Sequence, residues 1–437
     1  MRVSPEVNWA NVDTNRPGST WMKRTTAGLV CGRAVAGVLS GLLVAGCTTA
    51  PAAEAPAPAT RIAVSGMPST FTTVADWSVE VRRGSTVSAA DAGILVLQPV
   101  GAGGFVVSVL DPETGVPRWV SVPIPITDGV PRAGFTADDG RQWVVLESTA
   151  GATTVLRVFD AFAVGRNVRP VHDRTFEGAE EQPPVVAVTD RGVLVTRVKG
   201  GGPFVYRPAS GVAQVFGTPG QEPIRSYGTD VLVTLAGGFG LIAEKIGWLS
   251  KDRVPPGVAG PATATVMAVD GSFVVATWIG RDQRATLALH ELLTGRVRAT
   301  IGLVTTDPAV RQPQPFVVAR DGAWAVYGSH AVNLRTGTTT MLRGGPYIFA
   351  QIQDGVAYGV LEPVGTARSA TPSRSASSPV MGQPAVVDLL TGAVLDPRTP
   401  STVPSDFDGL GHGLLVVRAA GSRDDTLYAV PLKRWRP

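Results

Sequence analysis

Short β-branched runs, each introduced by a Gly or Asp turn, recur along most of this chain of 437 residues. The runs are apolar and bounded by Gly, Asp and Pro, which is typical of strands and not of helices. Their turn residues lie about 46 residues apart on average, and such a period indicates a repeat architecture with four strands in each unit. The eight turn positions are 93, 140, 192, 230, 271, 322, 355 and 413.

A second element follows the first in several units, and its clearest copy is Asp111-Pro-Glu-Thr114-Gly115, with Trp119 four residues later. This spacing suits a hairpin between a third and a fourth strand. The Asp or Asn side chain accepts backbone N–H bonds in the turn, and Gly supplies a positive φ. Weaker copies are Glu291, Thr294 and Gly295; Asn333, Thr336 and Gly337; and Asp388, Thr391 and Gly392, with 207–211 as a degenerate fifth.

The run Asp-x-x-Thr-Gly-x-x-x-Trp resembles the blade signature of quinoprotein-type (PQQ-like) β-propellers. The resemblance implies that Trp119 packs between neighbouring blades, while Asp111 and Thr114 stabilise its hairpin. Together with the repeat period, it predicts an all-β fold, an eight-bladed β-propeller. Seven blades are the alternative, because the segment 237–261 is irregular.

The two ends of the repeat region complement each other. The segment 76–81 alternates like an outermost strand that has lost its own blade, whereas the segment 413–435 lacks a fourth strand. We therefore expect the N-terminal strand to close the last blade, which would hide two sheet edges. The propeller is assigned to residues 70–437, with a disordered insertion rich in Ser, Pro, Thr and Ala at 363–384.

The first long apolar stretch ends in Leu43-Val-Ala-Gly-Cys47, which resembles the lipobox of bacterial lipoproteins. A basic start at 22–24 and an apolar core at 34–45 precede it. That core is shorter than the roughly 20 residues needed to span a bilayer. The pattern predicts that Cys47 is the acylated first residue of the mature protein, held in membrane lipid.

The same reading divides the N-terminal region. Residues 1–46 are expected to be a lipoprotein signal peptide, whose true start is either Met1 or Met22; in the second case 1–21 is a mis-called start. Residues 47–69 are expected to be a flexible Pro/Ala-rich tether, since Pro-rich tracts are extended spacers. The mature protein would then lie at the extracytoplasmic face of the cell membrane, attached by its lipid.

Charge and cysteine content argue against nucleic-acid binding and against a disulfide. The net charge of +4 falls to +1 once the leader is set aside, because residues 1–46 hold five basic and two acidic residues. No basic face for nucleic acid is indicated. The two cysteines are Cys31, in the leader, and Cys47, so a disulfide is not expected in the mature chain. A monomer is expected.

No catalytic or metal-ligating motif emerges from the sequence. The histidines are His172, His290, His330 and His412; none has the spacing of a zinc site, and loop or turn positions are expected for them. The PQQ-like resemblance implies the fold alone, so no PQQ, other cofactor, catalytic residue or metal is predicted. The expected function is a non-catalytic scaffold that binds an unknown envelope protein or ligand. A quinoprotein-like oxidoreductase or a hydrolase using the central funnel is the alternative.

Overall fold

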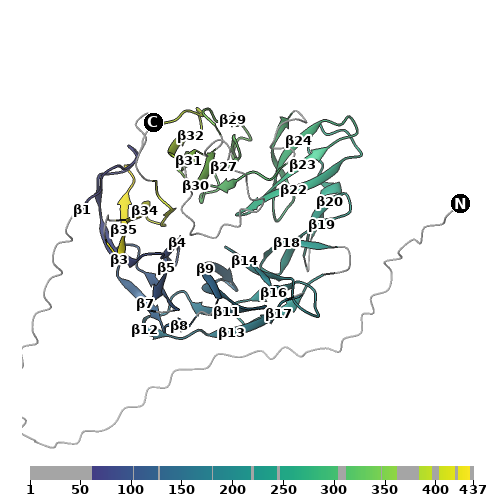
Figure 1. The fold of residues 1–437 in the computed structure, drawn as a ribbon. Helices are drawn as coiled ribbons and strands as arrows, with labels where there is room; N and C mark the ends of the chain where they lie inside the picture. The colour runs from purple at the N-terminus through teal and green to yellow at the C-terminus, as the bar shows by residue number, and fades with distance from the viewer. Residues whose placement is uncertain are drawn as a thin grey trace, which may run out of the picture. The chain divides into compact units, whose positions relative to one another are not determined.

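The computed structural model describes residues 62–433, with gaps at 102, 126–127, 180, 218–220, 244–246, 304–311, 346, 362–382, 396–402 and 419–421. Eight sheets follow one another around a ring (Figure 1). The fold is an all-β, eight-bladed β-propeller, so the prediction from the repeats is confirmed and the seven-bladed alternative is wrong. Within the described segments, no helix is long and apolar enough to cross a membrane.

The first four blades are built from strands that run in chain order from the ring axis outward. Blade 1 consists of β4 (Thr86–Ala90), β5 (Gly93–Val100), β6 (Gly104–Leu110) and β7 (Pro117–Ser121), with β8 (Ile124–Pro125) beside β6. Blade 2 consists of β9 (Asp128–Asp138), β10 (Arg141–Ala150), β11 (Thr153–Asp160) and β13 (His172–Glu177). Blade 3 consists of β14 (Val185–Thr189), β15 (Gly192–Thr196), β16 (Phe204–Arg207) and β17 (Val212–Val215). Blade 4 consists of β18 (Glu222–Tyr227), β19 (Asp230–Leu235), β20 (Gly238–Ile242) and β21 (Trp248–Leu249), followed by the short 3-10 helix η1 (Ser250–Asp252).

The other four blades repeat this order, and the last one borrows its outermost strand. Blade 5 consists of β22 (Thr263–Asp270), β23 (Phe273–Ile279), β24 (Ala285–Glu291) and β25 (Val297–Leu303). Blade 6 consists of β26 (Phe316–Val318), β27 (Trp324–Tyr327), β28 (His330–Asn333) and β29 (Thr339–Met341). Blade 7 consists of β30 (Tyr347–Gln353), β31 (Val356–Leu361) and β32 (Gln383–Asp388). Blade 8 consists of β33 (Asp406–Phe407), β34 (His412–Arg418), β35 (Asp424–Pro431) and β3 (Trp77–Arg82).

The predicted turn positions mark one place in every blade. Each of them lies within two residues of the start of the second strand, from Gly93 in β5 to Gly413 in β34. The apolar run after each turn is this second strand, which is buried on both faces between the neighbouring blades. A strand buried on both faces needs a continuous apolar run, and this explains why it dominates the sequence pattern.

The core is divided among the interfaces between blades. Eight clusters of buried apolar side chains occur, one for each pair of neighbouring blades around the ring. The cluster between blades 8 and 1, for example, contains Trp77, Ile94 and Leu427. Each blade therefore depends on its two neighbours for most of its buried surface, as in other repeat architectures.

Closure of the ring follows the prediction. β3 pairs antiparallel with β35, so that Val79 lies opposite Leu427 and Trp77 opposite Ala429. The N-terminal strand thus supplies the missing fourth strand of blade 8, and the expected closure is confirmed. β1 (Ile62–Ala63) and β2 (Val74–Ala75) form a small separate pair just before β3.

The structure departs from the expected boundaries at two places. Ile62 and Ala63 form β1, so regular structure begins before the expected boundary at residue 70. Gln383 and Pro384 open β32 and do not belong to the expected insertion 363–384, whose other residues lie outside the described residues. The expected signal peptide 1–46 and Cys47 also lie outside them.

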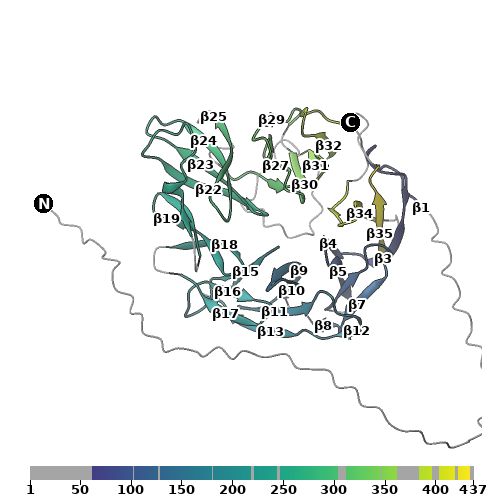
Figure 2. The ribbon, with the colours of Figure 1, turned by 180° about the vertical axis from the view of Figure 1, so that it is seen from behind.

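One strand was not predicted at all. After the third strand of blade 2, the chain returns to blade 1 and adds β12 (Gly165–Val168) parallel to β7, at the outer edge of that blade (Figure 2). Gly165 lies opposite Trp119 in this pair. The chain then goes back to form β13, the fourth strand of blade 2. Blades 1 and 2 are therefore joined by main-chain hydrogen bonds as well as by side chains.

Candidate functional site

The predicted blade motifs form the turns between third and fourth strands. In blade 1, Asp111 Oδ1 accepts hydrogen bonds from the backbone N–H of Glu113 and Thr114 and from the Thr114 hydroxyl, each at 3.1 Å. Gly115 has a φ of 70°. Asp388 caps the turn of blade 7 in the same way, through Thr391. The carboxylate thus satisfies backbone donors that the turn leaves unpaired.

The motifs of blades 6 and 5 have Asn333 and Glu291 as the acceptor in place of Asp. Asn333 Oδ1 accepts from the N–H groups of Arg335 and Thr336, as the carboxylate of Asp111 does in its own turn. Glu291 has a longer side chain and accepts instead from the Thr294 hydroxyl, at 2.6 Å, and from Arg298. All of these bonds lie within one hairpin, so they stabilise turns.

Trp119 joins its turn to the next blade. Its side chain is 0% exposed, its Nε1–H donates to the Ala161 carbonyl of blade 2 at 3.2 Å, and its ring stacks on Phe159. Trp77 and Trp248 make the same contact from the fourth strands of blades 8 and 4, with the carbonyls of Pro112 and Leu292, each at 2.8 Å. The role of these two was missed in the sequence, although each lies in a fourth strand as Trp119 does.

The glycines of the two receiving turns are explained by these rings. A Cβ atom on Gly115 would lie 2.5 Å from the Trp77 ring, and one on Gly295 would lie 2.5 Å from the Trp248 ring. Both positions also have a positive φ, which a larger residue adopts at a cost. Glycine is therefore required there for two independent reasons.

The degenerate motif at 207–211 obtains its carboxylate from the neighbouring blade. Arg207 stands where the other turns carry Asp, Asn or Glu. Asp138, at the end of β9 in blade 2, accepts from Arg207 Nε at 2.7 Å and from the Ala209 N–H at 3.0 Å. A carboxylate of blade 2 thus caps the turn of blade 3. The hairpin keeps its cap although its own sequence lacks the acidic residue.

Charged side chains near the ring axis gather where the first strand of each blade turns into the second. Arg320, in this turn of blade 6, bypasses blade 7 to reach blades 8 and 1. It donates to the carbonyls of Phe407, at 3.2 Å, and Ala89, at 3.5 Å, and lies 3.6 Å from the Asp91 carboxylate. One side chain thus reaches across this end of the channel and links three blades.

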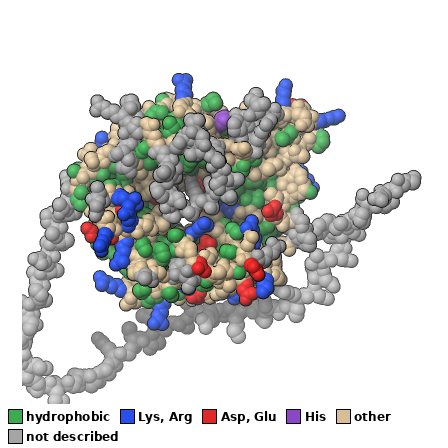
Figure 3. Space-filling view, viewed as in Figure 1, with side chains coloured by type: hydrophobic (Ala, Val, Ile, Leu, Met, Phe, Trp, Pro, Cys, Tyr) green, Lys and Arg blue, Asp and Glu red, His purple; other side chains and the backbone are tan. Residues whose placement is uncertain are grey.

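Other polar groups at the same end also connect blades. Asp406 of blade 8 accepts from the Ala89 N–H of blade 1, at 2.8 Å, and from Gln351 of blade 7, at 2.9 Å. Arg225 of blade 4 pairs with Asp190 of blade 3 at 2.8 Å. On the face seen in Figure 3, acidic and basic side chains are interspersed around a hollow centre.

The four histidines all lie in strands, so their expected assignment to loops or turns is wrong. His172 begins β13, His330 begins β28 and His412 begins β34, while His290 lies within β24. His290 is fully buried and bonds Trp278 Nε1–H and the Gly295 carbonyl, at 3.1 and 3.0 Å. Burial lowers the pKa of His290, which the bond to Gly295 partly offsets. A neutral imidazole, with one donor and one acceptor, fits these two partners.

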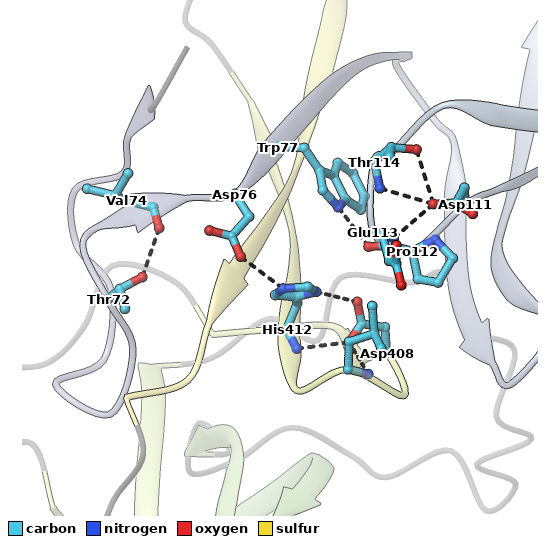
Figure 4. A network of polar contacts seen from close by, with 11 residues as sticks. Thr72, Val74, Asp76, Trp77, Asp111, Pro112, Glu113, Thr114, Asp408 and His412 are labelled. Carbon is cyan, nitrogen blue, oxygen red and sulfur yellow. Dashed lines mark hydrogen bonds and ion pairs between the residues drawn. The ribbon is translucent and has the colours of Figure 1, made fainter. Parts of the chain in front are cut away.

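His412 is in a different environment, at the closure of the ring. Figure 4 shows it between two carboxylates, with Nδ1 2.7 Å from Asp408 and Nε2 3.1 Å from Asp76. The hydrogen bond with Asp408 is the main cause that raises the pKa of His412; burial opposes it, and the charges of both carboxylates and the bond with Asp76 add to the rise. This group was not predicted, because its members lie at opposite ends of the chain.

Searching the described residues for metal or ligand sites gives little. No group of three or more His, Cys, Asp or Glu side chains that could hold a metal ion is found among them. A small cavity between blades 5 and 6 is lined by apolar side chains such as Val275, Leu289 and Phe316. Apart from Tyr327 its lining side chains are apolar, so it has little with which to orient a ligand.

Comparisons with known proteins identify neither a family nor a function for this chain. No protein-family model matches the chain, and no curated protein matches it. Among solved structures, it is similar to an uncharacterised protein from Listeria monocytogenes, with 11% identity, a TM-score of 0.38, and coverage of 74% of this chain and 98% of that chain. It is also similar to the dihydro-heme d1 dehydrogenase NirN in complex with DHE (14% identity, TM-score 0.41, coverage of 81% and 78%). A third structure is the WD40 domain of Toxoplasma gondii coronin (11%, 0.33, 82% and 87%). At these TM-scores, the likeness carries no argument about function.

Proposed function

We propose that this chain is a membrane-anchored, extracytoplasmic β-propeller lipoprotein that acts as a non-catalytic scaffold or binding module. The observation that carries the proposal is the use of charged side chains near the ring axis. Arg320, Asp406 and Asp190 are each bonded to another blade. Catalysis needs acidic and basic groups that converge on a substrate, whereas these groups hold blades together.

The blade architecture adds support for the quinoprotein-like class without its cofactor. Trp119, Trp77 and Trp248 each bond the turn of the next blade, which is the structural role that the resemblance implies for Trp119. This role concerns docking between blades, so it brings no cofactor site with it. The alternative of an oxidoreductase or hydrolase in the funnel gains no support from these contacts.

The anchoring part of the proposal rests on the lipobox-like run that ends at Cys47. A cysteine carrying two or more acyl chains anchors stably where a single chain would not. Replacing Cys47 with Ser should yield unprocessed precursor or release the protein from membranes, as measured by fractionation and by labelling with an acyl-chain probe. Processed Cys47→Ser protein that only detergent removes from membranes would refute acylation at this residue.

The binding surface is best tested where large apolar side chains are exposed. Phe162 and Val164 are 52% and 76% exposed and lie just before β12, at the outer edge of blades 1 and 2. Exposed apolar groups of this kind often mark protein-binding sites. Cross-linking on intact membranes should capture a defined partner with the wild type and lose it with Phe162→Ser plus Val164→Ser, but not with the control Leu410→Ser.

Two further outcomes would count against the proposal as stated. A partner captured equally by the wild type and the double variant would place binding elsewhere on the propeller. A turnover activity that depends on groups near the ring axis, such as Arg320, would contradict a non-catalytic scaffold. The stability of each variant is measured first, because Arg320 also holds the ring together.

A further inference from the structure

Three ionisable side chains meet at the point where the two ends of the propeller join. Asp76 lies just before β3, in the N-terminal segment, whereas Asp408 and His412 flank the turn between β33 and β34 (Figure 4). His412 Nδ1 lies 2.7 Å from Asp408 Oδ2, and Nε2 lies 3.1 Å from Asp76 Oδ2. The imidazole therefore bridges the first and the last parts of the ordered chain.

The two carboxylates that contact the imidazole are not held equally firmly in the structure. The Asp408 side chain is 1% exposed, and its Oδ1 also accepts from the backbone N–H groups of Leu410 and His412, each at 2.9 Å. It is fixed by its own turn. Asp76 is 55% exposed and directly precedes β3, the strand that closes the propeller. If β3 detached from blade 8 and the propeller opened, the contact between His412 and Asp76 would therefore be the one that breaks.

The geometry fits only one protonation state well. A protonated imidazole donates from both nitrogens and satisfies both carboxylates. A neutral imidazole has one donor, so its other nitrogen would direct a lone pair at a carboxylate oxygen. Other charged side chains also lie on the elements around this group. In the strands of blade 8 they are Glu80, Arg82, Asp406, Arg418, Asp424 and Asp425. Asp111 and Glu113 lie in the turn that receives Trp77, and Lys433 follows β35.

We propose that His412, Asp408 and Asp76 form a proton-operated clasp on the closure of the propeller. The clasp is tight when the imidazole is protonated and loosens when it is neutral. Local pH would then set how firmly the N-terminal strand is held in blade 8. This inference is independent of whether Cys47 is acylated, because it concerns only the ordered ring.

The direction of the pH effect follows from the shift. The Asp408 hydrogen bond, above all, raises the pKa of His412 over its ordinary value of about 6.5. A raised pKa gives stability that is fully present below the unfolded-state pKa and is lost as pH rises through the folded-state pKa. The clasp therefore contributes in mildly acidic solution and fails in alkaline solution.

The test compares melting temperatures of the wild type and His412→Gln at about pH 5.5 and about pH 9, on either side of the His412 titration. We expect the wild type to melt several degrees above the variant at the lower pH, and the gap to narrow at the higher pH. His172→Gln is the matched control, because His172 also docks on a neighbouring blade, through the Ala209 carbonyl at 3.4 Å. The difference in melting temperature between the wild type and His172→Gln should not follow the titration of His412.

A second variant keeps the proposal testable if His412→Gln does not fold. Asp76→Asn removes one charge from the clasp and keeps an acceptor oxygen, so the pKa of His412, followed by NMR of its imidazole, should fall. An unchanged titration in Asp76→Asn would overturn the clasp. So would a melting gap for His412→Gln that is equal at both pH values, since that result would make the residue a pH-independent structural contact.

Discussion

One contact recurs between blades, and different residues provide it. Trp77, Trp119 and Trp248 each donate from Nε1 to a turn carbonyl of the next blade. In blade 2 the same position is occupied by His172, whose ring lies over Gly211 and whose Nε2 is 3.4 Å from the Ala209 carbonyl. A flat ring with a polar edge suits this position, because the edge bonds a turn carbonyl. In Trp77, Trp248 and His172 the ring also covers the glycine of that turn.

The first prediction concerns Trp119. Truncating a buried aromatic side chain in a core typically costs about 3–5 kcal/mol. Because Trp119 is fully buried between blades 1 and 2, Trp119→Ala should lower the melting temperature clearly in thermal unfolding followed by circular dichroism. Val116→Ala is the control, since Val116 lies in the same hairpin and is 60% exposed. Equal melting of the two variants would contradict the docking role.

The second prediction concerns His290, whose pH effect is opposite to that of His412. Burial lowers the pKa of His290, so the unfolded chain takes up a proton that the folded chain excludes. This part of the stability is present above about pH 6.5 and is lost as pH falls below it. In denaturant titrations, the free energy of unfolding of His290→Gln should fall less steeply between pH 7 and pH 5 than that of the wild type, by roughly the loss of one titrating group. Parallel pH profiles would show that His290 titrates normally.

How far single residues could be predicted depends on where their partners are. The roles of Asp111 and Thr114 are local, within one hairpin, so the motif indicates them directly. Trp77 and Trp248 act on turns that lie 35 and 44 residues away, and no local pattern surrounds them. The pair of His412 and Asp76 is 336 residues apart, beyond the reach of any periodicity.

At the scale of single elements, a turn can borrow the group that it lacks. Asp138 bonds Arg207 and Ala209 across the boundary between blades 2 and 3. The third prediction is that Asp138→Ala destabilises the protein by about 1–3 kcal/mol, because it leaves the half-buried donors of Arg207 and Ala209 without their acceptor. Asp139→Asn, at the exposed neighbouring position with a φ of 53° that Asn tolerates, should change the free energy of unfolding, measured in urea, by much less. The reverse order would mean that the turn of blade 3 does not need the carboxylate.

Elements were predicted where periodicity carries them. The second strand of every blade was found because its burial on both faces demands an apolar run. β12 was not found, since Gly165-Arg-Asn-Val168 has neither an apolar run nor an alternation. It pairs with β7 through backbone groups alone, and the backbone leaves no trace in the sequence pattern. The start of regular structure at Ile62 was missed for the same reason.

At the scale of the whole molecule, the ring behaves as one cooperative unit. Eight apolar clusters lie between neighbouring blades, so removing any blade would expose two of them. The closing interface between blades 8 and 1 has a cluster of its own, built around Trp77, Leu110 and Leu427. Closure by β3 is therefore part of the core and is more than protection of a sheet edge.

The fourth prediction follows from this closure. Deleting residues 70–83 removes β3 and should destabilise the entire propeller, lowering the melting temperature and broadening the transition measured by calorimetry. Deleting residues 48–60, in the expected tether, is the matched control and should leave the melting temperature unchanged. Similar melting of both deletions would mean that the ring does not depend on its N-terminal strand.

The pairing of β3 with β35 also has a consequence for how the protein is made. β3 leaves the ribosome first among the strands of the eight blades, yet its partner is the last strand to be synthesised. Until then, the main-chain groups of β3 that bond β35 remain unpaired, and an unpaired apolar strand is prone to join other chains. A chain that ends before β35 cannot pair this strand. We therefore expect chaperones and proteases to recognise truncated chains and not complete ones.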